Sequence, residues 1–544
     1  MVCAPHAERG LGVNPDFSTR SAVLSRAEGR GFNPAAKRLP TFCSSSAPRG
    51  AGRETGEQLE ASVTAGLKPR PSLSVVRIFG GPRPSLPISP ARTTAYRILR
   101  CVQAGRGFGV DLLQSQEVSA LKEADRRLAT ELVMGVLRWR GELDFQIEGV
   151  SGRPLERLDP EVMTILRMGV YQIQFLERVP KAATVNEAVE MTKAAHKRSA
   201  TGFVNAVLRK CPPGKRRVRL QRFDDLDTAT LASVRRATPA WLLERWANNF
   251  AQAGMAGNDV ALRLAWTSTQ VPPTVLRVVD LAQDIPRLRE ELAGEGIETR
   301  LGRFAARALV VESGDVQASQ ALRECRVVIQ DEASQLVADL LAPQVGCRVL
   351  DLCAAPGIKA GQIAQSLGRG TLVTCDRSAA RLRTMARLLP QWLPKEVRWL
   401  PIQLDATRAL PFRCHFERIL LDAPCSGTGT LARNPEIKWR LRPADLKRLA
   451  EAQVGMLKSA LASLSFAGRL VYATCSLEPE ENQCVVERVL EESPGYQVVS
   501  PIELKSVYPA LSPMFDPKGY WRTRPDLHTM DGFFAAVIVR KNQC

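Results

Sequence analysis

Residues that bind metals are scarce in this chain. Only 4 of its 544 residues are histidine, and the 13 cysteines form no C-x-x-C pair. Structural zinc sites draw on clustered cysteine and histidine, and disulfide frameworks draw on regularly spaced cysteines. We therefore expect neither a metal site nor a disulfide framework. Scattered free thiols fit a reducing cytoplasm.

Long apolar runs and leader patterns are missing as well. No stretch approaches the ~20 apolar residues that cross a bilayer. The first residues lack the basic segment and apolar run of a signal peptide, so we expect no membrane anchoring and a cytoplasmic location. The pattern G-x-x-x-x-G-K-[ST] is also absent, which argues against a Walker-type phosphate loop.

Positive charge, in contrast, is abundant. The chain has 75 Lys and Arg against 56 Asp and Glu, a net charge of +19, and 45% hydrophobic residues, which suffice for ordinary globular cores. Such an excess favours a polyanionic partner, nucleic acid first and an anionic membrane surface second. A generally basic proteome would produce the same composition, so charge alone does not decide.

The chain begins with a segment of unusual composition. Residues 1–90 are rich in Arg, Ser, Pro and Gly, and their 12 basic and 6 acidic residues give a net +6. Without apolar periodicity, little could offset the entropy of ordering them, so we predict a disordered basic extension. It is interpreted as a dispensable tail or as the product of a start codon assigned too far upstream. Glu54, Glu57 and Glu60 argue against a transit peptide.

Helical periodicity dominates the next region. Apolar residues recur at helical spacing, as at Leu128 and Leu132. Thr184 with Glu187 has the pattern of a capping box that begins a further helix. We predict an all-helical domain over residues 91–222.

The end of this region is strongly basic. Seven Lys and Arg fall within residues 209–222, a window that either follows nucleic-acid phosphates or is a solvated linker, and we favour RNA contact. Residues 236–330 then mix helical and extended patterns and predict a small α/β connector, whose sequence indicates no chemistry.

Strands and helices alternate over residues 331–541. We predict strands at residues 349–353, 371–376, 397–404, 418–422, 469–474 and 533–539. This repetition is typical of a parallel, doubly wound, Rossmann-like sheet. Ligands of such sheets lie outside the carboxyl ends of the strands.

Small and acidic residues follow the early strands. The turn Cys353-Ala354-Ala355-Pro356-Gly357-Ile358-Lys359 opens a helix, and its small side chains allow a ligand to approach backbone N–H groups. Asp376 and Asp405 end the next two strands. Each alone is typical of a helix N-cap, but together they favour a nucleoside cofactor whose ribose hydroxyls they could bind.

Two cysteines occupy turns after later strands. Cys425 lies in Asp422-Ala423-Pro424-Cys425, and Cys475 lies in Thr474-Cys475-Ser476. A lone cysteine is usually a small buried hydrophobe. Two thiols in polar turns on the ligand side of a sheet do not fit that interpretation.

Methylation of cytosine at carbon 5 needs such a thiol. A thiolate that adds to carbon 6 makes carbon 5 enamine-like and able to attack a methyl sulfonium. The base must first leave its stack. Loss of the carbon 5 proton then lets the thiolate leave, which a second thiol or an acid can assist, and Asp422 can hydrogen-bond the base or the cofactor.

These motifs resemble the RsmB/Sun family of RNA 5-methylcytosine methyltransferases. The similarity covers about residues 90–541 and includes Asn434-Pro435-Glu436-Ile437-Lys438-Trp439 and Asp531-Gly532-Phe533-Phe534. The two cysteine motifs together are highly specific. The resemblance implies a NusB-like RNA-binding domain ahead of a Rossmann-like methyltransferase domain. It further implies S-adenosylmethionine as cofactor, a cytosine of 16S (small-subunit) ribosomal RNA as substrate, and no metal; we expect a monomer.

Residue roles also follow from the resemblance. Cys475 would be the nucleophile and Cys425 would help to release the product, with Asp422 also at the catalytic centre. DNA cytosine methyltransferases instead use the cysteine of a Pro-Cys motif, and the element around Cys475 favours the RNA arrangement. The residues implied to hold the cofactor are Cys353, Ala354, Ala355, Pro356, Gly357, Ile358, Lys359, Asp376, Asp405 and Asp422.

Two positions depart from the family pattern. Ile358 stands where the family usually has a second glycine, and Ala360 stands where it has threonine. An isoleucine at positive φ would be strained, so the turn would differ slightly and cofactor affinity would fall. We expect binding to survive, since Pro356, Gly357 and Lys359 remain.

Two other functions stay open. An RNA-binding factor without catalysis would explain the charge but not the two thiols. A methyltransferase acting on an amine would use an Asn/Asp-Pro-Pro-aromatic turn, whereas Pro424 is followed here by Cys425.

Overall fold

The computed structural model describes residues 88–214 and 222–541. All of these residues belong to one structural unit. The predicted extension over residues 1–90 lies almost wholly outside the described residues. The centre of the basic window, residues 215–221, lies outside them too.

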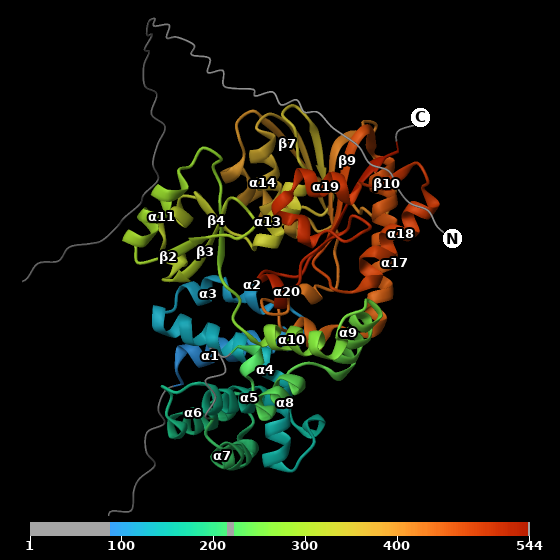
Figure 1. Ribbon diagram of the computed structural model, residues 1–544. Helices are drawn as coiled ribbons and strands as arrows, with labels where there is room; N and C mark the ends of the chain where they lie inside the picture. The colour runs from blue at the N-terminus through green and yellow to red at the C-terminus, as the bar shows by residue number, and fades with distance from the viewer. Residues whose placement is uncertain (1–87, 215–221, 542–544) are drawn as a thin grey trace, which may run out of the picture. The chain divides into compact units, whose positions relative to one another are not determined.

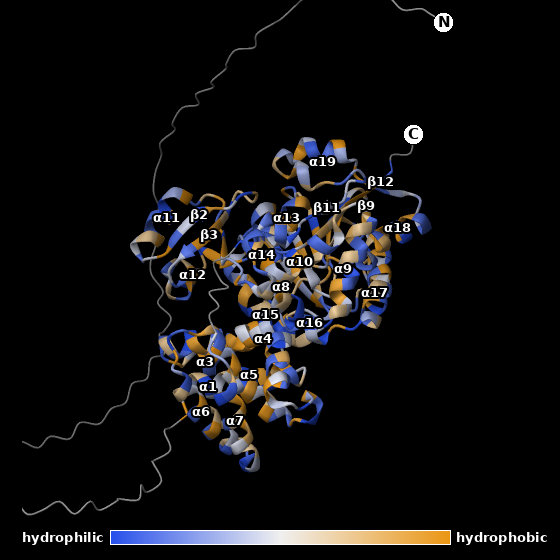
Figure 2. Cartoon of the chain, turned by 60° about the horizontal axis from the view of Figure 1, so that its bottom comes forward, coloured by the Kyte–Doolittle hydropathy of each residue, from blue (hydrophilic) through white to orange (hydrophobic). Residues whose placement is uncertain are grey.

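The first described part is helical, as the sequence predicts. Apolar side chains at helical spacing build a core in which Leu132, Ile165 and Leu208 are fully buried, and Figure 2 shows hydrophobic and hydrophilic residues alternating along these helices. The helices are α1 (Pro90–Gln103), α2 (Gly109–Leu113), α3 (Gln116–Ser119), α4 (Glu123–Ser151), α5 (Pro160–Phe175), α6 (Lys181–Ala194) and α7 (Thr201–Lys210).

The predicted capping box at Thr184 is wrong. Helix α6 begins at Lys181, with Pro180 as its N-cap residue, and the Thr184 hydroxyl donates to the Pro180 carbonyl inside the first turn. Glu187 instead pairs with Arg92 of α1 at 3.1 Å. Glu187, which the local pattern predicts to cap a helix, therefore forms a tertiary ion pair instead.

Helix α8 (Thr228–Arg236) precedes the region expected to be an α/β connector, which itself begins with α9 (Ala240–Gln252) and α10 (Gly257–Thr269). Helices α8 and α10 add Val234, Ala265 and Trp266 to the helical core. A small sheet follows, in the order β2-β3-β1-β4 with every pair antiparallel. Its elements are β1 (Val275–Val278), α11 (Ile285–Gly294), β2 (Glu298–Leu301), β3 (Ala308–Ser313), α12 (Gln320–Arg323) and β4 (Val327–Ile329).

A second, larger sheet carries the remaining strands in the order β10-β12-β9-β8-β5-β6-β7, with β11 beside β12 (Figure 1). The strands are β5 (Arg348–Asp351), β6 (Gly370–Asp376), β7 (Val397–Gln403), β8 (Phe416–Asp422), β9 (Leu464–Thr474), β10 (Tyr496–Val498), β11 (Trp521–Arg522) and β12 (Phe534–Arg540). Strands β5 to β9 pair in parallel, as predicted. Strand β12 is antiparallel to both of its neighbours, β9 and β10, so β10 runs in the same direction as β9 and β12 alone of these three strands is reversed. The sheet is therefore mixed rather than wholly parallel.

Helices cover both faces of the large sheet. Neighbouring strand residues such as Val349 and Leu350 point to opposite faces, so each face has its own apolar core. One face packs on α13 (Glu332–Leu340), α14 (Ile358–Leu367), α15 (Ala379–Leu388) and α19 (Pro501–Val507), and the other on α17 (Pro443–Ala462) and α18 (Gln483–Glu492). The layering confirms the predicted Rossmann-like fold class, with a helical domain ahead of it.

Two short helices, α16 (Ile437–Arg440) and α20 (Pro525–His528), lie between these layers and the helical region. Within the described ranges, no helix combines the length and the apolar character needed to cross a bilayer. No group of three or more His, Cys, Asp or Glu in the same ranges could hold a metal ion.

Candidate active site

A cavity of about 310 Å³ opens at the carboxyl ends of β5 and β8, where a sheet of this kind binds its ligand. Its walls come from the turn after β5, the ends of β8 and β9, and loops that reach in from β4 and from the segment before β12. The lining residues are Ile329, Gln330, Asp331, Ser334, Asp351, Cys353, Ala354, Ala355, Pro356, Ile358, Lys359, Asp422, Thr430, Arg433, Cys475, Asp531 and Phe533.

The turn after β5 depends on a glycine. Gly357 has a φ of 104° at the N-cap of α14, and a Cβ there would meet Cγ of Met385 at 2.9 Å. Ile358 is already the first helical residue, so the strain considered for an isoleucine at positive φ does not arise. The residue with left-handed backbone is thus Gly357, one position before Ile358, which departs from the family pattern.

Asp351 is the most unusual group in the cavity. Its side chain is 1% exposed, and neither carboxylate oxygen has a hydrogen-bond partner among the described residues. Burial, followed by the neighbouring charge of Asp422, raises the pKa of Asp351 to about 7. A buried carboxylate without donors is costly, which is typical of a group that meets its donors on a ligand.

Lys359 and Asp422 form the ion pair at the floor of the cavity. The Lys359 ammonium lies 2.7 Å from Asp422 Oδ2 and 5.3 Å from the ring centre of Phe533. Burial opposes the charge of Lys359, but Asp422 outweighs it and raises the pKa of the ammonium. The lysine therefore stays charged, next to the cysteine at the end of β9.

The two predicted thiols lie together. Strands β8 and β9 are neighbouring parallel strands, and the sulfurs of Cys425 and Cys475 are 3.4 Å apart in the turns that follow them. Both side chains are half-buried. The hydrogen bond to Cys475, together with burial, raises the pKa of Cys425 well above its usual value, so Cys425 is held as a neutral thiol.

Glycines let three loops meet beside these thiols. The N–H of Gly429 donates to the carbonyl of Cys475 at 2.9 Å, and the N–H of Gly532 donates to the carbonyl of Gly429 at 2.8 Å. A Cβ on Gly429 would come within 2.0 Å of the Gly532 carbonyl oxygen. Only a residue without a side chain fits at this approach.

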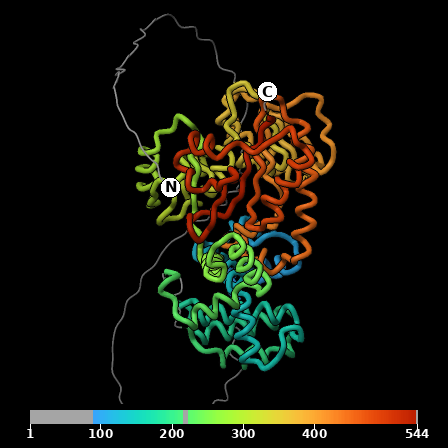
Figure 3. The backbone as a smooth tube through the Cα atoms, turned by 45° about the vertical axis from the view of Figure 1, so that its right-hand side comes forward, coloured from blue at the N-terminus to red at the C-terminus, as the bar shows by residue number. Residues whose placement is uncertain are grey.

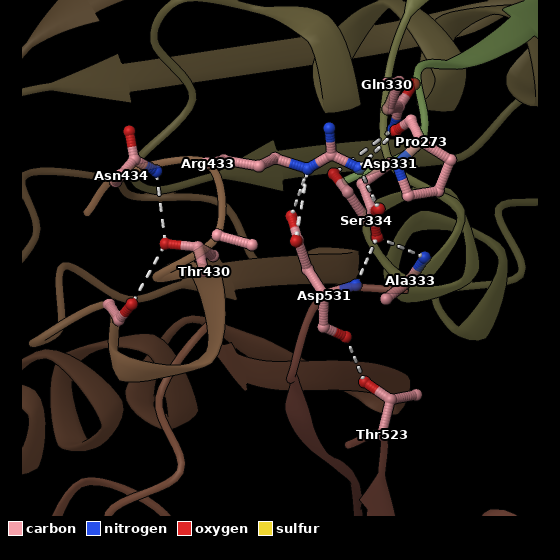
Figure 4. A network of polar contacts seen from close by, with 12 residues as sticks. Pro273, Gln330, Asp331, Ala333, Ser334, Thr430, Arg433, Asn434, Thr523 and Asp531 are labelled. Carbon is pink, nitrogen blue, oxygen red and sulfur yellow. Dashed lines mark hydrogen bonds and ion pairs between the residues drawn. The ribbon is translucent and has the colours of Figure 1, made fainter. Parts of the chain in front are cut away.

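An ionic network forms the opposite wall (Figure 4). Arg433 donates to Asp331 at 2.7 Å, to Asp531 at 3.0 Å and to the carbonyl of Pro273 at 3.1 Å. Burial raises the pKa of Asp531, while Arg433 lowers it. The network joins four segments that lie far apart in the sequence, and it fixes one side of the cavity.

Two predicted cofactor residues lie away from the cavity wall. Asp376 accepts a hydrogen bond from the N–H of Ser378 at 2.8 Å and pairs with Arg381. Asp405 accepts from the N–H and hydroxyl of Thr407, which lowers its pKa. Both carboxylates thus make the local turn contacts that the capping alternative describes.

Of the other predicted site residues, the structure brings eight to the cavity: Cys353, Ala354, Ala355, Pro356, Ile358, Lys359, Asp422 and Cys475. Cys425 joins them through its contact with Cys475, and Gly357 shapes the turn from behind. Asp351, Asp331 and Arg433 were not predicted as site residues. Asp351 ends β5, two residues before the predicted turn that begins at Cys353, and could have been found from that position. Nothing in the sequence links Asp331 to Arg433.

Two family descriptions match the chain. Residues 338–539 match the family described as 16S rRNA methyltransferase RsmB/F, and residues 89–212 match the NusB family.

Individual proteins match over most of their length. The probable ribosomal RNA small subunit methyltransferase B of Bacillus subtilis is 31% identical over 459 residues, covering 83% of this chain and 98% of that protein. The ribosomal RNA small subunit methyltransferase B of Pseudomonas putida is 32% identical, covering 74% and 89%. The crystal structure of PH0851 shares the fold, with a TM-score of 0.66, 23% identity, and coverage of 84% of this chain and 100% of that one.

Proposed function

Because this chain belongs to the family of RsmB-type ribosomal RNA small subunit methyltransferases, we propose that it methylates carbon 5 of a cytosine in 16S ribosomal RNA. The methyl donor is S-adenosylmethionine, and the reaction passes through a covalent adduct between Cys475 and carbon 6 of the base. The single observation that carries this proposal is the pair of sulfurs, 3.4 Å apart, at the mouth of the large sheet.

The cavity has groups that suit S-adenosylmethionine. Asp351 presents two buried acceptors without donors, and the turn from Cys353 to Ile358 brings backbone close to the same space. The cofactor's hydrogen-bond donors would therefore relieve the cost of burying Asp351. When bound, S-adenosylmethionine supplies an electrophilic methyl group.

Residues of the chain handle the base and its protons. The thiolate of Cys475 adds to carbon 6 and makes carbon 5 nucleophilic. After methyl transfer, the carboxylate of Asp422 accepts the proton that carbon 5 loses. The neutral thiol of Cys425 donates its proton to the sulfur of Cys475 as the bond to carbon 6 breaks.

The helical region and the catalytic part would act together on the RNA. We propose residues 91–222, with their basic end, as an RNA-binding part, residues 236–330 as the connector and residues 331–541 as the catalytic part. We further propose that the protein acts as a monomer in the cytoplasm, which sedimentation and cell fractionation would test.

Incubation with labelled S-adenosylmethionine and under-methylated 16S ribosomal RNA tests the proposed function. We expect label in the RNA, located at carbon 5 of cytosine by bisulfite mapping and mass spectrometry. Cys475→Ser should lose turnover, because a hydroxyl is a far weaker nucleophile than a thiolate. Cys425→Ser should accumulate a covalent RNA complex, visible on a denaturing gel.

Cys414→Ser is a matched control, because Cys414 is an exposed free cysteine that does not line the cavity. It should methylate RNA as the unmodified chain does. Full activity of Cys475→Ser, or label on an exocyclic amine, would contradict the proposed reaction.

A further inference from the structure

A buried glutamate lies directly behind the two thiols. Glu481 has 0% exposure and ends the short helix Pro479–Glu481. Its carboxylate accepts hydrogen bonds from four donors on three segments, namely the N–H of Ser426 at 2.8 Å, the Ser426 hydroxyl at 2.5 Å, the Ser476 hydroxyl at 2.6 Å and the Gln453 amide at 3.1 Å. Both oxygens are therefore satisfied inside the protein.

These contacts fall next to the reacting residues. Ser426 directly follows Cys425, and Ser476 directly follows Cys475. One carboxylate oxygen takes both serine hydroxyls, and the two hydroxyl oxygens are themselves 3.0 Å apart. The turn after β8 and the turn after β9 are thus tied together one residue beyond each sulfur.

The backbone around Glu481 is held as firmly as its side chain. The hydroxyl of Tyr472, on β9, donates to the Glu481 carbonyl at 2.5 Å. The N–H of Glu478 donates to the Ser476 hydroxyl at 3.0 Å. The carboxylate therefore has a fixed position relative to the end of β9, and it transfers that position to the turn that carries Cys425.

We propose that Glu481 is a positioning residue that sets the distance and direction between the sulfurs of Cys425 and Cys475, and so governs release of the product from the enzyme. This inference rests on the proposed function. The reaction needs Cys475 on carbon 6 and Cys425 close enough to return a proton to the departing sulfur. The two cysteine side chains contact each other directly only through their sulfurs. The position of one sulfur relative to the other therefore depends on the turns after β8 and β9 that carry them.

The location of Glu481 separates this role from binding. The side chain does not line the cavity, and its four donors are all protein groups. Its loss should therefore change the rate of release and leave the affinities for RNA and S-adenosylmethionine unchanged. The negative charge also contributes to the raised pKa of Cys425, after the hydrogen bond to Cys475 and burial, which helps to keep that thiol protonated.

The test compares Glu481→Gln with the full-length protein. The amide keeps the size of the side chain but offers a single acceptor oxygen to donors that now occupy two. We expect kcat to fall by about a hundredfold and the KM for RNA to fall with it, because slow breakdown of an accumulating covalent intermediate lowers both constants. The Kd values for RNA and for S-adenosylmethionine, each measured without the other so that no reaction occurs, should stay within about twofold. A covalent RNA complex should accumulate on a denaturing gel, as with Cys425→Ser.

Ser426→Ala and Ser476→Ala provide a second route to the same result. Each removes one hydroxyl from the carboxylate and leaves the fold with a small buried residue. Each should show a smaller fall in kcat, with unchanged Kd values and with some covalent complex. Glu491→Gln is the control, because Glu491 is an exposed glutamate of α18, and it should behave as the unmodified protein.

The outcomes separate this inference from the proposed function. If Cys425→Ser accumulates the complex but the Glu481 and serine variants release product at the normal rate, the positioning role is wrong. The same conclusion follows if those variants lose rate without accumulating complex, because damage to the fold slows addition and release alike. If neither Cys425→Ser nor any other variant forms a complex, the proposed reaction itself fails.

Discussion

The contact between α16 and the helical region differs from the cavity in how it treats buried polar groups. Lys438 of α16 is 1% exposed, and its ammonium donates to the carbonyls of Arg138 and Ala237 and to the hydroxyl of Ser268. Asp351 in the cavity is buried to the same degree and has no donor. Burial lowers the pKa of Lys438 to about 7 and raises that of Asp351 to about 7.

The difference separates a structural site from a binding site. Around α16, the buried donors of Lys438 and Trp439 find acceptors on the helical segments, although Oε2 of Glu436 has no partner among the described residues. Glu436 accepts from the N–H of Gly109, and Trp439 donates to the carbonyl of Leu137. Figure 3 shows the start of the described chain, in blue, beside the orange part of the chain to which α16 belongs. In the cavity both oxygens of Asp351 lack a partner, which supports the proposal that this carboxylate meets donors on a ligand.

Arg433 gives the strictest test of this comparison, because it lines the cavity and yet pairs with two carboxylates, those of Asp331 and Asp531. Arg433→Met would leave Asp331 and Asp531 as buried carboxylates without a cation. We expect the free energy of unfolding to fall by about 3–5 kcal/mol, measured by urea denaturation. Arg448→Met, at a largely exposed arginine, is the control and should change little. If Arg433→Met lost binding of S-adenosylmethionine without losing stability, Arg433 would serve ligand binding, as proposed for Asp351, and not the structure.

Asp351→Asn sharpens the comparison through pH. The folded pKa of about 7 lies above the unfolded value, so the native state binds more protons between about pH 4 and pH 7. The unmodified protein therefore loses stability as the pH rises through this window. The Asp351→Asn variant does not undergo that loss, so its stability relative to the unmodified protein should rise by up to about 4 kcal/mol. Urea denaturation from pH 4 to pH 8 measures this rise.

Asp405→Asn is the matched control for this pH series. Hydrogen bonds from Thr407 lower the pKa of Asp405, so its charge contributes stability that is lost as the pH falls. This variant should lose stability relative to the unmodified protein as the pH rises from the acid range. Equal slopes for the two variants would mean that Asp351 is not the group whose burial sets the pH dependence.

Lys438→Met tests the satisfied side of the comparison. The thioether fills the space but leaves three acceptors without a donor, so we expect a loss of about 2 kcal/mol in the free energy of unfolding. Turnover of the folded protein should be retained, because Lys438 does not line the cavity. Lys447→Met, at an exposed lysine of α17, is the control, and an equal effect of both variants would remove the special role of Lys438.

Trp439→Phe should give the smallest effect. The indole N–H donates to the carbonyl of Leu137 at 3.2 Å, and phenylalanine keeps most of the ring while losing that donor. We expect a loss of about 1 kcal/mol, seen as a small fall in the thermal midpoint with unchanged methylation. A change in turnover larger than the change in stability would show that α16 also affects the cavity.

The sequence predicted the parts of the site that follow from strand ends. Parallel strands present their carboxyl ends at one edge, so Cys425 after β8 and Cys475 after β9 had to lie near each other once the order of strands was right. The same reasoning placed Lys359 and Asp422 at that edge. Periodicity also gave the helical region and the alternation of strands and helices.

Tertiary contacts account for what the sequence did not give. Asp331, Arg433 and Asp531 meet only after three loops converge, and their spacing carries no periodic signal. Local chemistry misled at Glu187, which pairs with a distant arginine instead of capping a helix. The antiparallel pairing of β12 depends on the direction of the last connection, which apolar patterns do not report.

The contact between α16 and the helical region ties the methyltransferase part of the chain to the helical part. Helix α16 belongs to the part that matches the methyltransferase family, yet the helical part provides the acceptors for Lys438 and Trp439 and for the guanidinium of Arg440. In a fragment that starts near residue 331, these groups would be exposed to water. The segment after the Cys425 turn would then lose its contacts with the helical part. Because these acceptors are backbone carbonyls, exchange of the helical part between relatives would keep the contacts wherever the new backbone holds the same position against α16.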